Sequence, residues 1–296
     1  MTRCLLAACF LAGGAPLLAA APVKLYVSAD MEGVAGVVTG DQLGTTGFEY
    51  ARFREFMTEE VNAALAAARE AGATEFVVAD SHGNMQSLLP ERLPSDVVLV
   101  RGTPRPQGMM QGLDATFAGV VFVGYHAGTT SSEGVRAHSF SSATLADVRL
   151  NGVSVPEGVW NAALAGHYGV PVLAMSGDDA VAREVKARLG DLETAVVKWA
   201  DGFHAARTLT PEAARTVIRE TVRRAVARRA DFRPYRLASP IEVELRFKNY
   251  RPSEVLSWLP GIRRADAHTV RFTARDMVEA YRFLQFTLNY QAALEP

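Results

Sequence analysis

The stretch KLYVSADMEGVAG, residues 24–36, is an apolar run that ends in two carboxylates, Asp30 and Glu32. A short apolar run bounded by glycines is typical of a strand buried in a parallel sheet. The two acidic residues stand one residue apart where this strand would end, beside Gly33 and Gly36. Like charges at a buried strand end repel each other unless cations are bound there. The stretch therefore predicts a central strand and a cation site at its carboxyl end.

Further apolar runs alternate with helical patterns, which is typical of an α/β fold with a mostly parallel sheet flanked by helices. Strands are predicted at 24–30, 75–80, 96–102, 118–125, 146–152 and 171–177, and helices at 50–71, 156–168, 178–189 and 211–230. The pattern changes at 232–240, after which IEVELRF (241–247) alternates strictly, as a strand with one buried face does. We expect an α/β metal-binding catalytic domain at 22–235 and a smaller C-terminal β-α-β-α lobe at 236–296.

The segment MTRCLLAACFLAGGAPLLAAAP has one early cation, Arg3, then an apolar run and an A-x-A-like site near Ala20 or Ala21. This order is typical of a secretory signal peptide, here 1–21, so we expect a periplasmic or secreted protein. LAAC, ending at Cys9, resembles a lipoprotein box, but too few residues precede it and lipidation is not expected. Because Cys4 and Cys9 both lie in this segment, the mature chain would have no thiol.

The composition narrows the class of function. The 296 residues are 49% hydrophobic, enough for a sizeable core, and a net charge of −1 favours neither nucleic acid nor a membrane surface as partner. No other apolar run is long enough for a stable membrane span. Nucleotide-binding glycine loops, H-E-x-x-H and G-x-S-x-G are absent from the sequence. The arginine-rich helix at 211–230 is expected to expose its charged face, with a subunit interface as the alternative.

Acidic and imidazole side chains follow the predicted strands. Since ligands of open parallel sheets bind at the carboxyl ends of the strands, we expect these side chains to meet at one edge. Two imidazoles and three carboxylates exceed the needs of one tetrahedral zinc ion, whereas two divalent metals about 3.5–4 Å apart, sharing a carboxylate, would use all five. Nitrogen and oxygen ligands favour zinc, with manganese or cobalt as alternatives. The candidate ligands are Asp30, Glu32, His82, His126 and Glu157.

Each candidate also has a structural explanation. Asp30 could cap a loop, Glu32 could lie on the surface, and His82 could be a turn residue paired with Asp80. His126 could be a neutral core histidine, and Glu157 could complement the positive end of a helix. The convergence of five such residues favours the metal site.

The neighbouring polar residues receive different predictions. His138, a dozen residues past His126, could reach the same edge as acid, base or nucleophile, and Glu133 lies in the same stretch. For His167 we expect packing or capping, and for His204 and His268 no role. In SGDDA (176–180), Asp178 and Asp179 are expected at a helix N-cap.

Four motifs together resemble the zinc-dependent D-aminopeptidase family (DppA-type) in the family's order: SADMEGVAG, ADSHGNM, VGYHAGTTSSEGVRAHSF and LNGVSVPEGVWNAALAGHYGVPVLAMSGDD. The resemblance runs from about residue 24 to the C-terminus. It implies a dizinc centre whose ligands match the five candidates, with Asp30 as the bridge, and a catalytic histidine that falls on His138. It also implies a ring-shaped homodecamer that admits small peptides with an N-terminal D-residue, such as D-Ala-D-Ala.

The expected function is an exported dizinc aminopeptidase that hydrolyses short peptides with N-terminal D-amino acids by metal-activated water. The partner is a small peptide substrate, and a homo-oligomer is expected. The alternatives are another dinuclear amidase or phosphoesterase, and a non-catalytic peptide-binding protein. The proposed rim contains no arginine placed to clamp phosphate, while a mere binder would not need five convergent ligands.

Overall fold

The computed structural model of the protein describes residues 22–290. The predicted signal peptide at 1–21, both cysteines and the lipoprotein-like box at Cys9 lie outside the described residues. No helix within 22–290 has the length and apolar character needed to cross a membrane.

The larger sheet has seven strands in the order β3-β2-β1-β4-β7-β8-β9, and only β9 runs antiparallel to its neighbour. The strands are β1 (Lys24–Ala29), β2 (Glu75–Asp80), β3 (Val97–Val100), β4 (Gly119–Tyr125), β7 (Val172–Asp178), β8 (Glu193–Gly202) and β9 (Ala205–Thr208). The first five confirm predicted strands, whereas β8 and β9 were not predicted. Their residues mix charged and apolar types, and only three of the ten residues of β8 and none of the four of β9 are buried.

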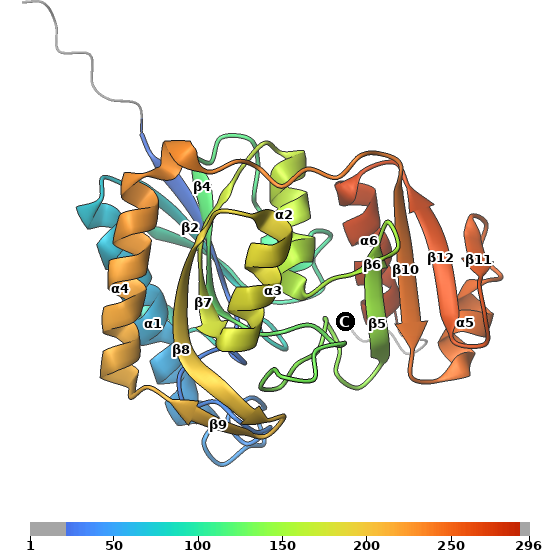
Figure 1. Ribbon diagram of the computed structural model, residues 1–296, viewed down its shortest axis with the longest axis horizontal. Helices are drawn as coiled ribbons and strands as arrows, with labels where there is room; N and C mark the ends of the chain where they lie inside the picture. Colours follow the sequence, from blue (N-terminus) through green and yellow to red (C-terminus); the bar gives the residue numbers. More distant parts are fainter. Residues whose placement is uncertain (1–21, 291–296) are drawn as a thin grey trace, which may run out of the picture.

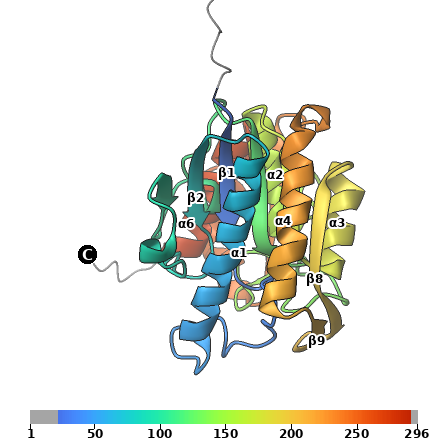
Figure 2. The same cartoon turned by 90° about the vertical axis from the view of Figure 1, so that its left-hand side faces the viewer.

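Helices cover both faces of this sheet, as expected for parallel strands. Figures 1 and 2 show α1 and α4 side by side on one face and α2 and α3 on the other. Their bounds are α1 (Tyr50–Glu70), α2 (Glu157–His167), α3 (Asp179–Leu189) and α4 (Pro211–Ala227), close to the four predicted helices. Arg215 and Arg219 of α4 form ion pairs with Glu59 and Glu70 of α1, so part of the arginine-rich face is matched by a neighbouring helix.

A second, antiparallel sheet has the order β11-β12-β10-β5-β6. It contains β5 (Leu145–Leu150), β6 (Val153–Ser154), β10 (Ile241–Phe247), β11 (Ile262–Arg264) and β12 (Thr269–Ala274), with α5 (Tyr250–Leu256) and α6 (Met277–Asn289). Placing the 146–152 strand in the parallel sheet was wrong, because Val148 and Leu150 pair with Leu245 and Val243 of β10. Helix α6 lies between this sheet and the larger body of the molecule (Figure 1).

The order in which successive strands are added reverses at β1, which has β2 and β3 on one side and β4 and β7 on the other. Such a switch point opens a crevice at the carboxyl ends of the strands. Two glycines let the loop after β1 cross the end of β4: Gly33 N donates to Gly124 O at 2.7 Å. A Cβ on Gly33 would lie 2.0 Å from Tyr125 O, and Gly124 has a φ of +73°. Asp30 is thereby held next to His126.

Candidate metal centre

All five predicted ligands meet at this edge of the sheet. Asp30 and Glu32 follow β1, His82 follows β2, His126 follows β4, and Glu157 is the first residue of α2. Each side chain is almost wholly buried. The predicted convergence is therefore confirmed by the positions of the side chains.

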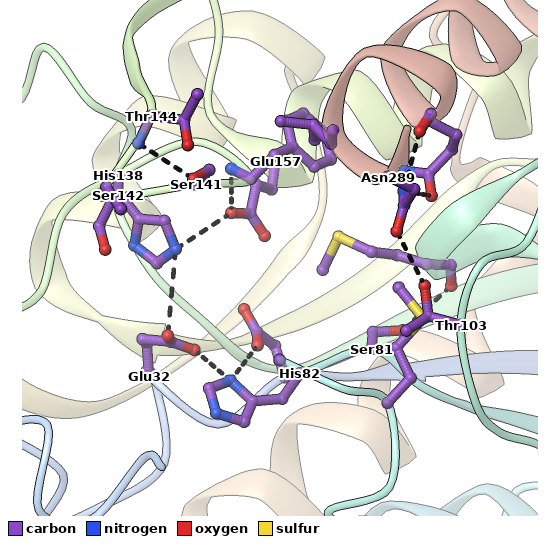
Figure 3. Close-up of a pocket in the computed structure, with 18 of the residues that line it drawn as sticks. Glu32, Ser81, His82, Thr103, His138, Ser141, Ser142, Thr144, Glu157 and Asn289 are labelled. Atoms are coloured by element: carbon purple, nitrogen blue, oxygen red, sulfur yellow. Dashed lines mark hydrogen bonds and ion pairs between the residues drawn. The ribbon is translucent and has the colours of Figure 1, made fainter. Parts of the chain in front are cut away.

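The first group of potential ligands contains Asp30, Glu32 and His82. Figure 3 labels Glu32 and His82. His82 Nδ1 lies 2.8 Å from Glu32 Oε2 and 3.3 Å from Asp30 Oδ1. One ligand atom from each of the three residues lies within 4.8 Å of the other two. One metal ion could therefore be held by these three residues.

The second group contains Asp30, His126 and Glu157. His126 Nε2 lies 3.3 Å from Asp30 Oδ2 and 3.5 Å from Glu157 Oε1. Asp30 thus faces His82 with one oxygen and His126 with the other. A carboxylate placed in this way can bridge two metal ions.

The backbone selects which nitrogen of each histidine faces the carboxylates. His82 Nε2 lies 2.8 Å from the carbonyl of Leu43, and His126 Nδ1 lies 3.0 Å from the carbonyl of Ala127. A carbonyl only accepts, so these nitrogens carry a proton, and His82 Nδ1 and His126 Nε2 face the carboxylates, each with a lone pair when its ring is neutral. Such hydrogen bonds commonly orient histidine ligands of metals.

Two buried atoms at the centre of the cluster lack a hydrogen-bond partner within the described chain, Asp30 Oδ2 and His126 Nε2. Buried polar atoms are rarely left unpaired, because desolvation is costly. A cation between them would satisfy both. The combination of carboxylate oxygens and imidazole nitrogens suits zinc. The residues therefore fit the metal that the sequence predicts.

The charges of the cluster lead to the same conclusion. Burial, reinforced by the charge of Glu32, raises the pKa of Asp30. Burial acts to lower the pKa of His82 and His126, but their carboxylate neighbours outweigh it and raise both values well above the usual range. Without metal, the fold therefore favours protons at positions that a divalent cation would occupy. Metal binding must displace these protons, so it should strengthen as the pH rises.

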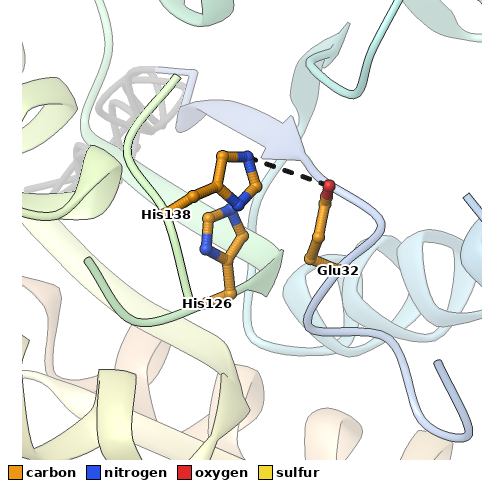
Figure 4. Close-up of side chains that lie close together, drawn as sticks. All are labelled: Glu32, His126 and His138. Carbon is orange, nitrogen blue, oxygen red and sulfur yellow. Dashed lines mark ion pairs between the residues drawn. The ribbon is translucent and has the colours of Figure 1, made fainter. Parts of the chain in front are cut away.

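His138 lies at the edge of this cluster, on the side that opens to a pocket. Its Nδ1 lies 2.8 Å from the carbonyl of Arg136, which leaves Nε2 free to exchange a proton. Nε2 is 3.6 Å from Glu157 Oε1 and 4.0 Å from Glu32 Oε1. Figure 4 shows the His138 ring over that of His126; the ring centroids are 4.2 Å apart.

The pocket beside the cluster has a volume of about 400 Å³, within the usual range for small-molecule sites. Most of the residues that line it are uncharged. They belong to segments that connect the strands of the two sheets and to α6 (Figure 3). Thr103 Oγ1 donates to Asn289 Oδ1 at 3.3 Å, which joins the loop after β3 to α6. The lining residues outside the metal cluster include Ser81, Thr103, Phe140, Ser141, Ser142, Thr144, Gln285 and Asn289.

Comparison with known proteins agrees with this geometry. The sequence profile of the family described as D-aminopeptidase matches residues 23–286. The chain belongs to the D-aminopeptidase family. It is therefore a hydrolase of peptide bonds. A D-aminopeptidase of Bacillus subtilis (strain 168) is 36% identical over 264 residues, covering 88% of this chain and 94% of that protein.

A solved structure of the D-aminopeptidase family has the same fold. It is described as the Zn-dependent D-aminopeptidase DppA from Bacillus subtilis, a self-compartmentalizing protease. The two structures superpose with a TM-score of 0.86 at 33% sequence identity, covering 92% of this chain and all of that one. The α/β architecture predicted from the sequence is therefore that of the family.

Several polar residues of this D-aminopeptidase family member lie outside the metal cluster. Glu133 is exposed and pairs with Arg183 at 2.8 Å. Asp80 is buried and accepts from Leu88 N at 2.6 Å. Asp178 caps α3, as predicted, by accepting from Val181 N at 2.7 Å, and it also accepts from Val135 N at 3.0 Å. His167 is exposed at the end of α2.

The loop that carries Asp30 and Glu32 is supported by two charged residues that sequence reasoning missed. Lys198 of β8 is wholly buried, and its ammonium group donates to the carbonyls of Glu32, Val34 and Val37. Glu60 of α1 accepts from Ala35 N at 3.0 Å. Lys198 stands in the apolar context AVVKWA, a pattern that hints at burial but does not show what the lysine binds.

Glu60→Gln should stabilise the metal-free chain above neutral pH. Burial raises the pKa of Glu60 from 4.5 to about 7, so between these values the folded state keeps a proton that the unfolded state releases. Stability of the wild type therefore falls as pH rises through this window, whereas glutamine does not titrate. Urea denaturation should show little difference below pH 4.5 and a gain of up to about 3 kcal/mol above pH 7. An identical difference at both pH values would contradict this assignment.

Proposed function

We propose that the protein is a dizinc aminopeptidase that hydrolyses short peptides with an N-terminal D-amino acid. The observation that carries the proposal is the position of Asp30, whose two carboxylate oxygens face two separate groups of potential ligands. Glu32 and His82 would complete one metal site, and His126 and Glu157 the other. The zinc dependence described for the Bacillus subtilis relative supports zinc as the metal.

The chain's own residues can bind and orient the substrate and move protons. When bound, the metal ions supply Lewis acidity, which polarises the scissile carbonyl and makes water acidic enough to lose a proton near neutral pH. His138 Nε2 faces the pocket and can take that proton and pass it to the leaving amine as the C–N bond breaks. The pocket walls, which come from segments of both sheets and from α6, position the short peptide and limit the access of other water molecules.

The pocket favours a peptide over a phosphate ester. No lysine or arginine of residues 22–290 lines it, whereas phosphate sites usually supply cationic donors. Apart from the candidate metal ligands and His138, the residues that line it are uncharged, which suits the neutral backbone of a short peptide. These features weigh against the phosphoesterase alternative, and the family assignment weighs against a non-catalytic binder.

Elemental analysis and a substrate screen test the proposal together. The purified chain should contain two zinc ions and cleave D-Ala-D-Ala and D-alanyl anilides faster than the corresponding L-substrates. Manganese or cobalt added to the metal-free chain tests the other candidate metals. Protein with two zinc ions that cleaves only L-peptides or phosphate esters would overturn the substrate assignment. Peptide binding without turnover and without stoichiometric metal would overturn the enzyme proposal.

The proposal extends to assembly and location. The relative is described as self-compartmentalizing, which supports a homo-oligomer here, with a decameric ring as the specific expectation. Sedimentation velocity should show a species of about ten chains, and a stable monomer would contradict it. The order of charge, apolar run and small residues at 1–21 supports export to the periplasm or medium. Mass spectrometry of the exported protein should place the new N-terminus after Ala20 or Ala21.

A further inference from the structure

A buried chain of hydrogen bonds runs beneath the metal cluster. It contains Tyr281, Asn161, Tyr125, Ser28 and Ser81, which we call the buried hydroxyl chain. Tyr281 donates to Asn161 Oδ1 at 2.8 Å, and Asn161 Nδ2 donates to the hydroxyl of Tyr125 at 2.9 Å. The Tyr125 hydroxyl lies 2.7 Å from Ser28 Oγ, which lies 2.8 Å from Ser81 Oγ. All five side chains are buried.

One direction of donation satisfies every hydroxyl in this chain. Because Tyr125 accepts from Asn161, its own proton can go to Ser28, and the proton of Ser28 can go to Ser81. Ser81 then donates to the carbonyl of Met109 at 3.1 Å. At the other end, the Tyr281 hydroxyl accepts from Met109 N at 3.2 Å. Fully satisfied buried networks of this kind fix the relative positions of the elements that they join.

The members of the buried hydroxyl chain adjoin the potential metal ligands in sequence. Ser28 is two residues before Asp30 on β1, Ser81 directly precedes His82, and Tyr125 directly precedes His126. Asn161 stands one helical turn after Glu157, on the same face of α2. The buried hydroxyl chain therefore joins β1, α2 and the ends of β2 and β4, the four elements that supply the potential metal ligands.

The Tyr281 end of the buried hydroxyl chain lies on the helix that forms one wall of the pocket. Tyr281 lies on α6, and Gln285 and Asn289 follow at intervals of four residues on the same helix face. Both line the pocket, and Asn289 is bonded to Thr103 (Figure 3). A displacement of α6 would thus be transmitted to the ends of β1, β2 and β4.

We propose that the buried hydroxyl chain is a positioning device that sets the spacing of the metal ligands and couples it to the pocket wall on α6. This inference rests on the proposed pair of metal ions. Tyr281 and Asn161 act through the elements that they join and contact neither substrate nor metal. Removal of groups that support metal ligands typically costs 10–100-fold in metal affinity or activity.

Tyr281→Phe tests the inference at the end remote from the metals, since the ring is kept and only the hydroxyl is lost. Zinc titration of the metal-free chain by calorimetry should show affinity about tenfold weaker for at least one ion. The visible spectrum of the cobalt-substituted variant should shift, because ligand geometry changes. We also expect a raised KM, since Gln285 and Asn289 lie on the same helix. Ser28→Ala is a smaller change within the buried hydroxyl chain, and it should show the same shifts in zinc affinity and in the cobalt spectrum.

Thr58→Val is the matched control. Thr58 is wholly buried on α1, and its hydroxyl accepts from Leu89 N at 3.1 Å, outside the buried hydroxyl chain. It should lower the melting temperature as Tyr281→Phe does but leave zinc affinity and the cobalt spectrum unchanged. Wild-type protein with two ions, together with Tyr281→Phe and Ser28→Ala proteins of unchanged affinity and spectrum, would overturn this inference alone. Wild-type protein with fewer than two ions would overturn the proposed metal pair and this inference with it.

Discussion

Asp30→Asn should remove both metal ions and reduce kcat/KM at least about a thousandfold. The side chain keeps its size and can still accept the hydrogen bond from Met31 N, which is 2.9 Å long to Asp30 Oδ1 in the wild type. It loses its charge, however, and only one of its two polar atoms can still act as an oxygen ligand. Lewis acid catalysis supplies several kcal/mol, and each 1.36 kcal/mol is a factor of ten in rate. Metal analysis after dialysis and steady-state kinetics on a D-alanyl anilide would measure both effects.

Two other carboxylates serve as comparisons for Asp30→Asn. Glu157→Ala should remove metal from only one position, because Glu157 belongs to one of the two groups that share Asp30, and it should also abolish turnover. Glu133→Ala should change neither, since Glu133 is exposed and pairs with Arg183. An Asp30→Asn protein that keeps two zinc ions and normal turnover would show that Asp30 is not the shared ligand.

The metal-free proteins offer a second measurement. Burial and the charge of Glu32 raise the pKa of Asp30, so the ionised form of Asp30 is unfavourable in the folded chain without metal. Asparagine removes this charge. Metal-free Asp30→Asn protein should therefore melt at a higher temperature than metal-free wild type at pH 7, while metal-loaded wild type melts higher than both. Equal melting temperatures of the two metal-free proteins would mean that burial and the charge of Glu32 do not disfavour the ionised form of Asp30 appreciably.

The sequence was sufficient to predict that the five candidate ligands meet, because parallel strands order their carboxyl ends. Once strands were assigned at 24–30, 75–80 and 118–125, Asp30, His82 and His126 had to fall at one edge of the sheet. The predicted helix at 156–168 put Glu157 at a helix start, and Glu157 is the first residue of α2. Local patterns thus determined where the candidate ligands lie, although they did not give the distances between them.

Long-range pairing explains what the sequence did not reveal. The 146–152 strand has the alternation of an antiparallel strand, but its partner β10 follows about a hundred residues later. Lys198 and Tyr281 have no local motif, since the first binds carbonyls after β1 and the second bonds to Asn161 on α2. Their roles depend on where distant segments pack, and only the structure shows this.

Two roles are open to His138, metal binding and proton transfer, and its contacts distinguish between them. Its Nε2 lies 3.6 Å from Glu157 Oε1, and it stacks on His126, so it borders the second group of ligands. Ligand atoms of Glu32, His126 and His138 also lie within 4.8 Å of one another. His138 is nevertheless less buried than His126, and it lines the pocket, where a substrate would meet it. Its access to the pocket favours proton transfer over metal binding.

His138→Ala should therefore keep both zinc ions and lower kcat by about 10²–10⁴-fold, the usual contribution of a general acid or base. KM should change little, because the pocket walls from α6 and the loop after β3 remain. His167→Ala is the matched control, since His167 is exposed at the end of α2, and it should behave as wild type. Loss of one zinc ion from the His138→Ala protein would instead make His138 a metal ligand, because proton transfer alone does not require it to hold metal.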